Sequence, residues 1–317
     1  MIQQIQQLER LTLVAPLGLR FCDSSSGTFV GDGLEVQVYP SGNPHQKVSA
    51  FANRKGVYVL HHAPGLRDLE NGDGTQAYWD NLPPPRNFVI EVSDRERRFQ
   101  SFRFTAGLPV KGLYEWSDPE FGSPPATVKG IPLYSTPVRS VPAGMAVVRA
   151  DLWDASNDVA ASWAVLEASL NDRTIARGIA DEQGRIALIF PYPAPRSFSV
   201  SSPPGSPLDS PPTAGTQALT EQVWSLRLRA FYTTDRPLPS PPNTFAANST
   251  LPELRFTLSQ PQADIWADTT LNEPLLEASL QYGQELILKS KAATPQPSPP
   301  SPTRQSVLFI TPAVSPP

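Results

Sequence analysis

Two neighbouring histidines, His61 and His62, are the residues best suited to chemistry in this sequence, because imidazole nitrogens bind metals and transfer protons near neutral pH. The loop that follows them carries carboxylates at Asp68, Glu70 and Asp73, and hard cations bind several such oxygens. However, adjacent residues of an extended strand point to opposite faces, so both imidazoles reach one metal only after a bend. The loop also lacks the ligand spacing and closing glutamate of an EF-hand. We therefore expect a polar turn here and no metal site.

Nucleophilic catalysis has no better support in the sequence. No serine occupies a G-x-S-x-G elbow, and the single cysteine, Cys22, lies in a strand-like segment, where a buried and inert thiol is the usual outcome. A fold could bring Asp80 and Glu91 together for glycoside hydrolysis, but nothing in the sequence selects them. The Gly-Asp-Gly segment at residues 31–33 lacks the strand, loop and helix context of a phosphate-binding loop. The sequence predicts no catalytic residues, no cofactor and no enzyme.

The composition excludes several classes of protein. The chain has 317 residues, 37 prolines and a formal net charge of −4, and it contains no long basic run, so a nucleic-acid partner is not expected. A single cysteine permits no intrachain disulfide, which fits a reducing compartment. Residues 1–13 lack the charged start and apolar core of a signal peptide, and no apolar run reaches the roughly 18 residues of a membrane-spanning helix. We expect a cytoplasmic protein that meets a membrane only through a partner.

The most regular stretch, Ala161–Pro195, predicts a β-meander of three strands. Apolar residues alternate along Ser162–Leu170, Thr174–Ala180 runs back, and Arg185–Phe190 forms the third strand. The turn Asp181–Gly184 has aspartate in its first position and glycine in its fourth, as a type I turn prefers. Prolines after residue 190 end the meander, because proline cannot donate to a sheet ladder.

Similar strand-sized segments occur on both sides of the meander, so the predicted fold class is all-β, with two β-sandwich domains. The other expected strands are Leu17–Cys22, Leu34–Tyr39, Val57–Leu60, Phe88–Ser93, Phe99–Thr105, Ala146–Trp153, Val223–Tyr232, Glu253–Leu258 and Gln284–Lys289, with a short helix at Leu271–Leu280. The expected organisation is an arm at 1–12, a first sandwich at 13–111, a connector at 112–143, a second sandwich at 144–260 with a proline-rich loop at 199–222, a short mixed segment at 261–291 and a proline-rich tail at 292–317 with a strand at 306–311.

Apolar residues outside the regular strands are the candidate contacts with partner proteins. The tail strand has high strand propensity on an extended tether, which suits pairing with an exposed sheet edge of this chain or of a neighbour; a disordered tail is the alternative. The arm has apolar residues spaced by three, which indicates a short amphipathic helix or a frayed terminus. The candidate contact residues are Ile2 and Ile5 in the arm, Trp79 in the first-domain loop, Trp116 and Phe121 in the connector, and Val307, Leu308, Phe309 and Ile310 in the tail.

Short motifs in residues 146–232 resemble the carboxypeptidase regulatory-like, or transthyretin-like, β-sandwich family, in which a strand ends in a D-x-x-G turn and re-enters the sheet. The resemblance implies two Ig- or transthyretin-like sandwiches and no active site, because the motifs belong to the scaffold. They are Trp163-Ala164-Val165, Arg177-Gly178, Asp181-Glu182-Gln183-Gly184-Arg185 and Phe190-Pro191, with weaker counterparts at Asp32-Gly33-Leu34-Glu35-Val36, Lys55-Gly56-Val57-Tyr58 and Asp94 to Phe99.

The tandem arrangement, the absence of a signal peptide and the proline-rich tail also resemble structural proteins encoded with contractile injection systems, the phage-tail-like particles of bacteria. This resemblance implies a non-enzymatic subunit of the cap or baseplate in the bacterial cytoplasm. Its partners would be tube, sheath, cap or baseplate proteins, and its own assembly a homo-oligomeric ring. The alternative is a carbohydrate- or surface-binding β-sandwich that stacks sugars on Trp79.

Overall fold

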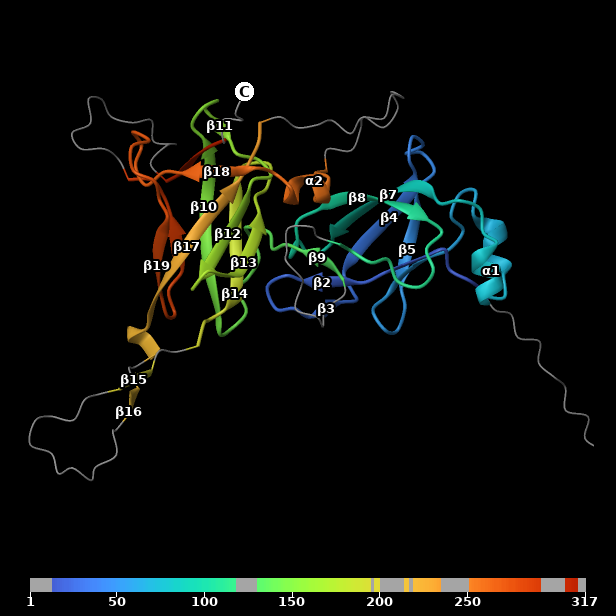
Figure 1. The fold of residues 1–317 in the computed structure, drawn as a ribbon, viewed down its shortest axis with the longest axis horizontal. Helices are drawn as coiled ribbons and strands as arrows, with labels where there is room; N and C mark the ends of the chain where they lie inside the picture. Colours follow the sequence, from blue (N-terminus) through green and yellow to red (C-terminus); the bar gives the residue numbers. More distant parts are fainter. Residues whose placement is uncertain are drawn as a thin grey trace, which may run out of the picture.

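The structure is a computed structural model that describes residues 13–117, 130–194, 197–199, 214–216, 219–234, 251–291 and 306–312. Strands account for 46% of it and helices for 7%, and the sheets are curled, which confirms the predicted all-β class. Figure 1 shows two groups of strands with the short helix α2 (Leu254–Leu258) between them. We call the strands of residues 13–135 the N-terminal unit and those of residues 145–312 the C-terminal unit.

The N-terminal unit consists of a six-stranded sheet in the order β1-β6-β5-β4-β7-β8 and a three-stranded sheet in the order β3-β2-β9. The sheet strand β9 lies within the expected connector, so this unit extends beyond residue 111. The elements are β1 (Leu17–Leu19), β2 (Phe21–Asp23), β3 (Phe29–Val30), β4 (Leu34–Pro40), β5 (Val48–Ala52), β6 (Tyr58–Leu60), the 3-10 helix η1 (Arg67–Asn71), α1 (Gln76–Asp80), β7 (Arg86–Asp94), β8 (Phe102–Leu108) and β9 (Ile131–Leu133).

The C-terminal unit forms a ten-stranded sheet whose main path is β11-β10-β21-β18-β17-β12-β13, while β14 and β20 pair with β10 and β19 pairs with β17. A separate two-stranded sheet joins β15 to β16. The elements are β10 (Met145–Asp154), β11 (Val159–Ala160), β12 (Val165–Leu170), β13 (Arg173–Ile179), β14 (Arg185–Pro191), β15 (Ser197–Ser199), β16 (Ala214–Thr216), the 3-10 helix η2 (Leu219–Glu221), β17 (Val223–Phe231), β18 (Gln262–Ile265), β19 (Glu277–Gln281), β20 (Leu286–Leu288) and β21 (Leu308–Thr311).

The predicted meander exists only in its first two strands. β12 and β13 form an antiparallel hairpin, but β14 pairs with β10 over seven residues, so the Asp181–Gly184 turn carries the chain to another part of the sheet. The turn itself is as expected, since Gly184 N donates to Asp181 O at 3.0 Å. Two further predictions are wrong: Glu253–Leu258 holds helix α2, and Leu271–Leu280 holds the start of β19. In both segments the spacing of the apolar residues fits the period of a helix and that of a strand, so tertiary packing decides which element forms.

The two units repeat one strand plan. Each has a strand near its start, β2 or β10, that ends in a buried aspartate, Asp23 or Asp154. That strand pairs in parallel with a short strand from the end of the unit. Asp23 lies opposite Leu133, and Asp154 lies opposite Ile310. In both units the next backbone N–H donates to that opposite residue, at 3.0 Å each time. The agreement in register makes β2 and β9 the counterparts of β10 and β21.

A second turn confirms the repeat. Gly56 N donates to Asn53 O at 2.9 Å, and Lys55 N donates to the Asn53 side chain at 2.8 Å. In the C-terminal unit, Gly184 N donates to Asp181 O in the same way, and Gln183 N donates to the Asp181 side chain. The strand after each turn pairs with the start of its unit, β6 with β1 and β14 with β10. The continuous β10 thus corresponds to β1 and β2 together, which are one residue apart. The central hairpins correspond too, because β4 pairs with β5 and β7 as β12 pairs with β13 and β17.

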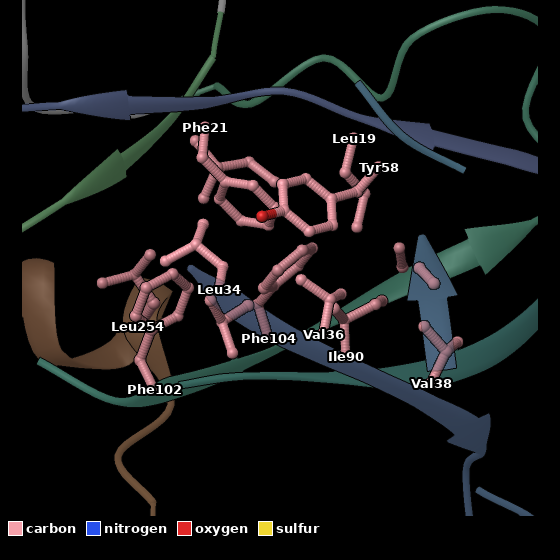
Figure 2. Close-up of a cluster of buried hydrophobic side chains, with 14 of the residues drawn as sticks. Leu19, Phe21, Leu34, Val36, Val38, Tyr58, Ile90, Phe102, Phe104 and Leu254 are labelled. Atoms are coloured by element: carbon pink, nitrogen blue, oxygen red, sulfur yellow. The ribbon is translucent and has the colours of Figure 1, made fainter. Parts of the chain in front are cut away.

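A shared hydrophobic core joins the units. Val165 and Ile179 of the C-terminal unit, with Leu254 and Leu258 of α2, belong to the same cluster of buried residues as the core of the N-terminal unit. Figure 2 shows Leu254 beside Phe102 at one end of this cluster. Hydrophobic contacts between units oppose relative motion, so this apolar contact favours one fixed arrangement of the two units.

Hydrogen bonds accompany the shared core. Arg103 N on β8 donates to Pro252 O at 2.9 Å, and the Gln100 side chain donates to Ile179 O at 3.5 Å. The Arg255 guanidinium donates to the Tyr114 hydroxyl at 2.8 Å. These bonds satisfy polar groups at the margin of the apolar contact, so the edge of β8 next to α2 is not left open.

A buried ion pair fastens the segment between the units. Arg139 Nη2 lies 2.6 Å from Asp23 Oδ2, and the guanidinium stacks 4.7 Å above the Phe99 ring. Burial alone would raise the pKa of Asp23, but hydrogen bonds from Arg139 and Ser25 outweigh burial and hold that pKa below its ordinary value. The carboxylate is therefore the form that the folded protein prefers.

We expect Leu254→Ala to lower the free energy of unfolding of the whole chain by about 3 kcal/mol, because it removes a fully buried side chain from the shared core. Urea unfolding followed by tryptophan fluorescence and by circular dichroism would measure it, with one coincident transition expected. Leu276→Ala, at an exposed position, should change the free energy of unfolding by no more than about 0.5 kcal/mol. Separate transitions for the two units in the unaltered protein would contradict the shared core.

We expect Asp23→Asn to cost about 3 kcal/mol at pH 7, because Arg139 loses its buried partner. Since the pKa of Asp23 is lowered on folding, its contribution is present above the unfolded value of about 4 and is lost as the pH falls through the folded pKa. The difference in unfolding free energy between variant and parent should therefore shrink below about pH 4.

The matched control for this ion pair is Asp172→Asn, which removes an exposed pair with Arg227 and should cost no more than about 1 kcal/mol at any pH. Urea titrations at a series of pH values give the required free energies. A gap between Asp23→Asn and the parent that stays constant down to pH 3 would argue against the ion pair.

Candidate assembly surfaces

The tail strand is part of the chain's own sheet. Leu308 pairs in parallel with Leu152 of β10, and Ile310 pairs in antiparallel with Ile265 of β18. All four predicted contact residues of the tail, Val307 to Ile310, are buried, with 9% or less of each exposed. The Ser290 hydroxyl accepts from Phe309 N at 3.0 Å and fixes the strand further. The edge that the tail strand completes therefore belongs to this chain, and these side chains support the C-terminal unit.

Trp116 of the connector also makes its contact inside the chain. Its ring packs edge-on against Phe104 with the ring centroids 5.7 Å apart, and the Arg255 guanidinium lies 4.9 Å above it. Its buried indole nitrogen has no hydrogen-bond partner. The side chain thus links the connector to α2 and to the core of the N-terminal unit. The remaining predicted contacts Ile2, Ile5 and Phe121 lie outside the described residues.

Trp79 lies on helix α1, in the long loop between β6 and β7, and is partly exposed. The Thr75 side chain caps this helix by accepting from Tyr78 N at 3.2 Å. Tyr78 stands edge-on to Trp79 with centroids 5.5 Å apart, and its hydroxyl donates to Leu69 O. The loop is therefore folded on itself, and Trp79 is the predicted contact that remains at the surface among the described residues.

The two histidines and Glu70 meet in the same loop. Glu70 is buried, and one of its carboxylate oxygens lies 3.6 Å from Nδ1 of both His61 and His62. The other oxygen accepts from the backbone N–H of His62. The carboxylate therefore anchors the loop next to β6. Within the described part of the chain, no group of three or more His, Cys, Asp or Glu residues could hold a metal ion.

Cys22 lies in β2 and is buried. Burial, and next the charge of Asp23, raise the pKa of its thiol to about 11. Because the thiolate is the nucleophile and is scarce so far below the pKa, Cys22 serves packing rather than reaction.

Large apolar side chains remain exposed at positions that the sequence did not single out. β5 itself was not predicted, and its Phe51 is the most exposed of them, at 69%. The available signal was the alternation in Val48–Ala52, where Ala50 faces inward and Phe51 outward. The exposed set is Leu13, Phe29, Phe51, Val138, Val159, Val223, Leu276 and Ile287.

Comparisons with known proteins identify no relative of this chain. No family model, no curated protein and no solved structure matches this chain. Among the described residues, no helix is long and apolar enough to cross a membrane. The motifs in the sequence and the geometry of the two units are therefore the basis for any statement about function.

Proposed function

We propose that this chain is a non-enzymatic structural subunit that assembles with other proteins, and that it belongs to the cap or baseplate of a phage-tail-like contractile injection particle. The observation that supports the assembly role is the shared core, through which the two repeated β units pack against each other. The particle itself is proposed from the resemblance of the D-x-x-G turns, the tandem units and the proline-rich tail.

A rigid pair of units suits an assembly role for a physical reason. A subunit fixes the relative positions of its neighbours only if its own parts do not move, and flexibly linked domains lose that ability. Here Val165, Ile179 and Leu254 replace a flexible joint with an apolar contact. The hydrogen bond from Arg103 N to Pro252 O fixes the segment before α2 at one position along β8. Binding through such preorganised surfaces costs little conformational entropy.

The contacts would be made by side chains that the fold leaves at the surface. Trp79 is partly exposed on α1, and Phe51 and Ile287 are exposed on strands. Ile2, Ile5 and Phe121 stay predicted contacts. Tube, sheath, cap or baseplate proteins in the bacterial cytoplasm would be the partners, and any contact with a membrane would pass through the assembled particle.

Sedimentation of particles from the organism that encodes this chain tests the proposal. We expect a tagged full-length chain to pellet with the tube and sheath proteins, which mass spectrometry identifies. In a strain that lacks the sheath gene, the tagged chain should shift to the supernatant or to a smaller complex. A chain that stays in the supernatant of cells with intact particles would overturn the proposed function.

A further inference from the structure

The strand line beside β10 is made of two separate pieces of chain. β20 and β21 both run parallel to β10, with β20 opposite residues 148–150 and β21 opposite residues 152–154. The two pieces therefore follow one another along the same line, although Leu288 and Leu308 are 20 residues apart in the sequence. A continuous strand would need a single residue between them, opposite Asp151. The chain instead leaves the line after β20 and returns to it as β21.

The N-terminal unit interrupts its partner strand at the same place. Leu113 lies opposite Gly18 in a parallel bridge, and β9 begins with Ile131 opposite Phe21. Ile131 N donates to Arg20 O at 2.8 Å, so these two pieces also follow one line. The segment after β9 runs directly to β10. The returning strand of this unit is therefore also the link to the neighbouring unit.

The returning strand of the C-terminal unit fills a defined place in the sheet. We call the place between β10 and β18, which β21 fills, the acceptor position. β21 pairs in parallel with β10 and in antiparallel with β18, so both of its edges have partners. Leu308 and Ile310 are fully buried, and Val307 and Phe309 are nearly so. The acceptor position therefore suits an extended peptide with large apolar residues on both faces.

The connection to β21 is much longer than its two ends require. Ser290 N donates to Val307 O at 3.0 Å, and Phe309 N donates to the Ser290 hydroxyl at 3.0 Å. Between these contacts lie the 14 residues 292–305, five of which are proline. Neighbouring elements of a compact domain are commonly joined by about two to six residues. The position of β21 in its own chain thus leaves most of this length without a purpose.

The length of the connection fits a neighbouring copy of the chain. A proline-rich segment spans about 3.1 Å per residue when it is extended, which gives 14 residues a reach of about 43 Å. A globular unit of the size of residues 145–312 is about 40 Å across. A strand on this connection can therefore reach the acceptor position of an adjacent copy as well as its own.

We propose that copies of this chain exchange β21, so that the strand of one copy fills the acceptor position of the next. The exchanged strand makes the same contacts as the strand in its own chain, so the exchange loses none of them. It gives the split strand of the C-terminal unit the linking role that β9 has inside the chain. This inference rests on the proposed assembly role and names the partner as a second copy.

The concentration of neighbouring copies controls the exchange. A connection of this kind holds β21 near its own acceptor position at an effective concentration of about 1 mM. Free chains at much lower concentrations therefore keep their own strand, as the structure shows. Copies that an assembly holds side by side meet one another at comparable local concentrations, and exchange then competes with closure inside the chain.

Disulfide trapping in the full-length protein tests the exchange. Asp264 on β18 lies opposite Thr311 on β21, and opposite residues of antiparallel strands are within disulfide distance. In a mixture of Asp264→Cys and Thr311→Cys chains, only a strand from the other copy brings these two cysteines together. The control mixture pairs Asp264→Cys with Phe51→Cys, because Phe51 is 69% exposed and reports random collisions. The native Cys22 is buried and takes no part.

We expect the first mixture, oxidised at about 1 mM protein, to give at least tenfold more covalent dimer on a non-reducing gel than the control mixture. A Thr311→Cys chain that also lacks residues 295–302 sharpens the result. The six residues left still join the adjacent ends, but their reach of about 19 Å is too short for a neighbouring copy. This shortened chain should fall to the control level with an unchanged circular dichroism spectrum.

A chain with both Asp264→Cys and Thr311→Cys shows where the strand lies. At about 1 µM it should close an internal disulfide, and at about 1 mM it should also form covalent dimers and longer chains. Internal closure alone at both concentrations would overturn the exchange. A first mixture that gives no more dimer than the control mixture would overturn it as well, and so would a shortened chain that still forms dimers as well as the full-length one.

These outcomes separate the inference from the proposed function. A chain that pellets with tube and sheath but gives only the control level of dimer refutes the strand exchange alone. A chain that exchanges its strand but never joins a particle refutes the particle assignment alone.

Discussion

The burial of α2 and of the β12–β13–β17 face in the core of the N-terminal unit is the contact on which the rest of the structure depends. Leu254, Val165 and Ile179 are almost fully removed from water, and each such side chain contributes about 2 kcal/mol through the hydrophobic effect. Without these contacts the chain would be two small β units on a linker, each with an exposed apolar patch. With them, the two units pack against each other through an apolar contact.

Buried aspartates at turns are the second constraint, and both units use them. Asp94 accepts from the backbone N–H groups of Arg98 and Phe99, and Asp181 accepts from those of Gln183 and Arg185. Asp154, fully buried, does the same for Ser156 N at 2.8 Å. A tight turn that is removed from water leaves backbone donors without partners, and a carboxylate that accepts two of them satisfies the turn from one side chain. The three turns share the buried aspartate but not the glycine, since only the turn at Asp181 has the D-x-x-G pattern, with Gly184 in its fourth position.

The sequence was informative where a signal is local and uninformative where the partner is distant. Alternation predicted β4, β7, β12 and β17, because period two follows from the strand itself. Alternation could not show that β14 pairs with β10, since a turn does not specify which strand the segment after it will pair with. Helix α2 was predicted as a strand because its start depends on Glu253, whose side chain accepts from Phe256 N at 2.6 Å. Of the predicted contacts, the tail strand and Trp116 were found in the chain's own fold, because apolar character shows that a residue is covered but not by what.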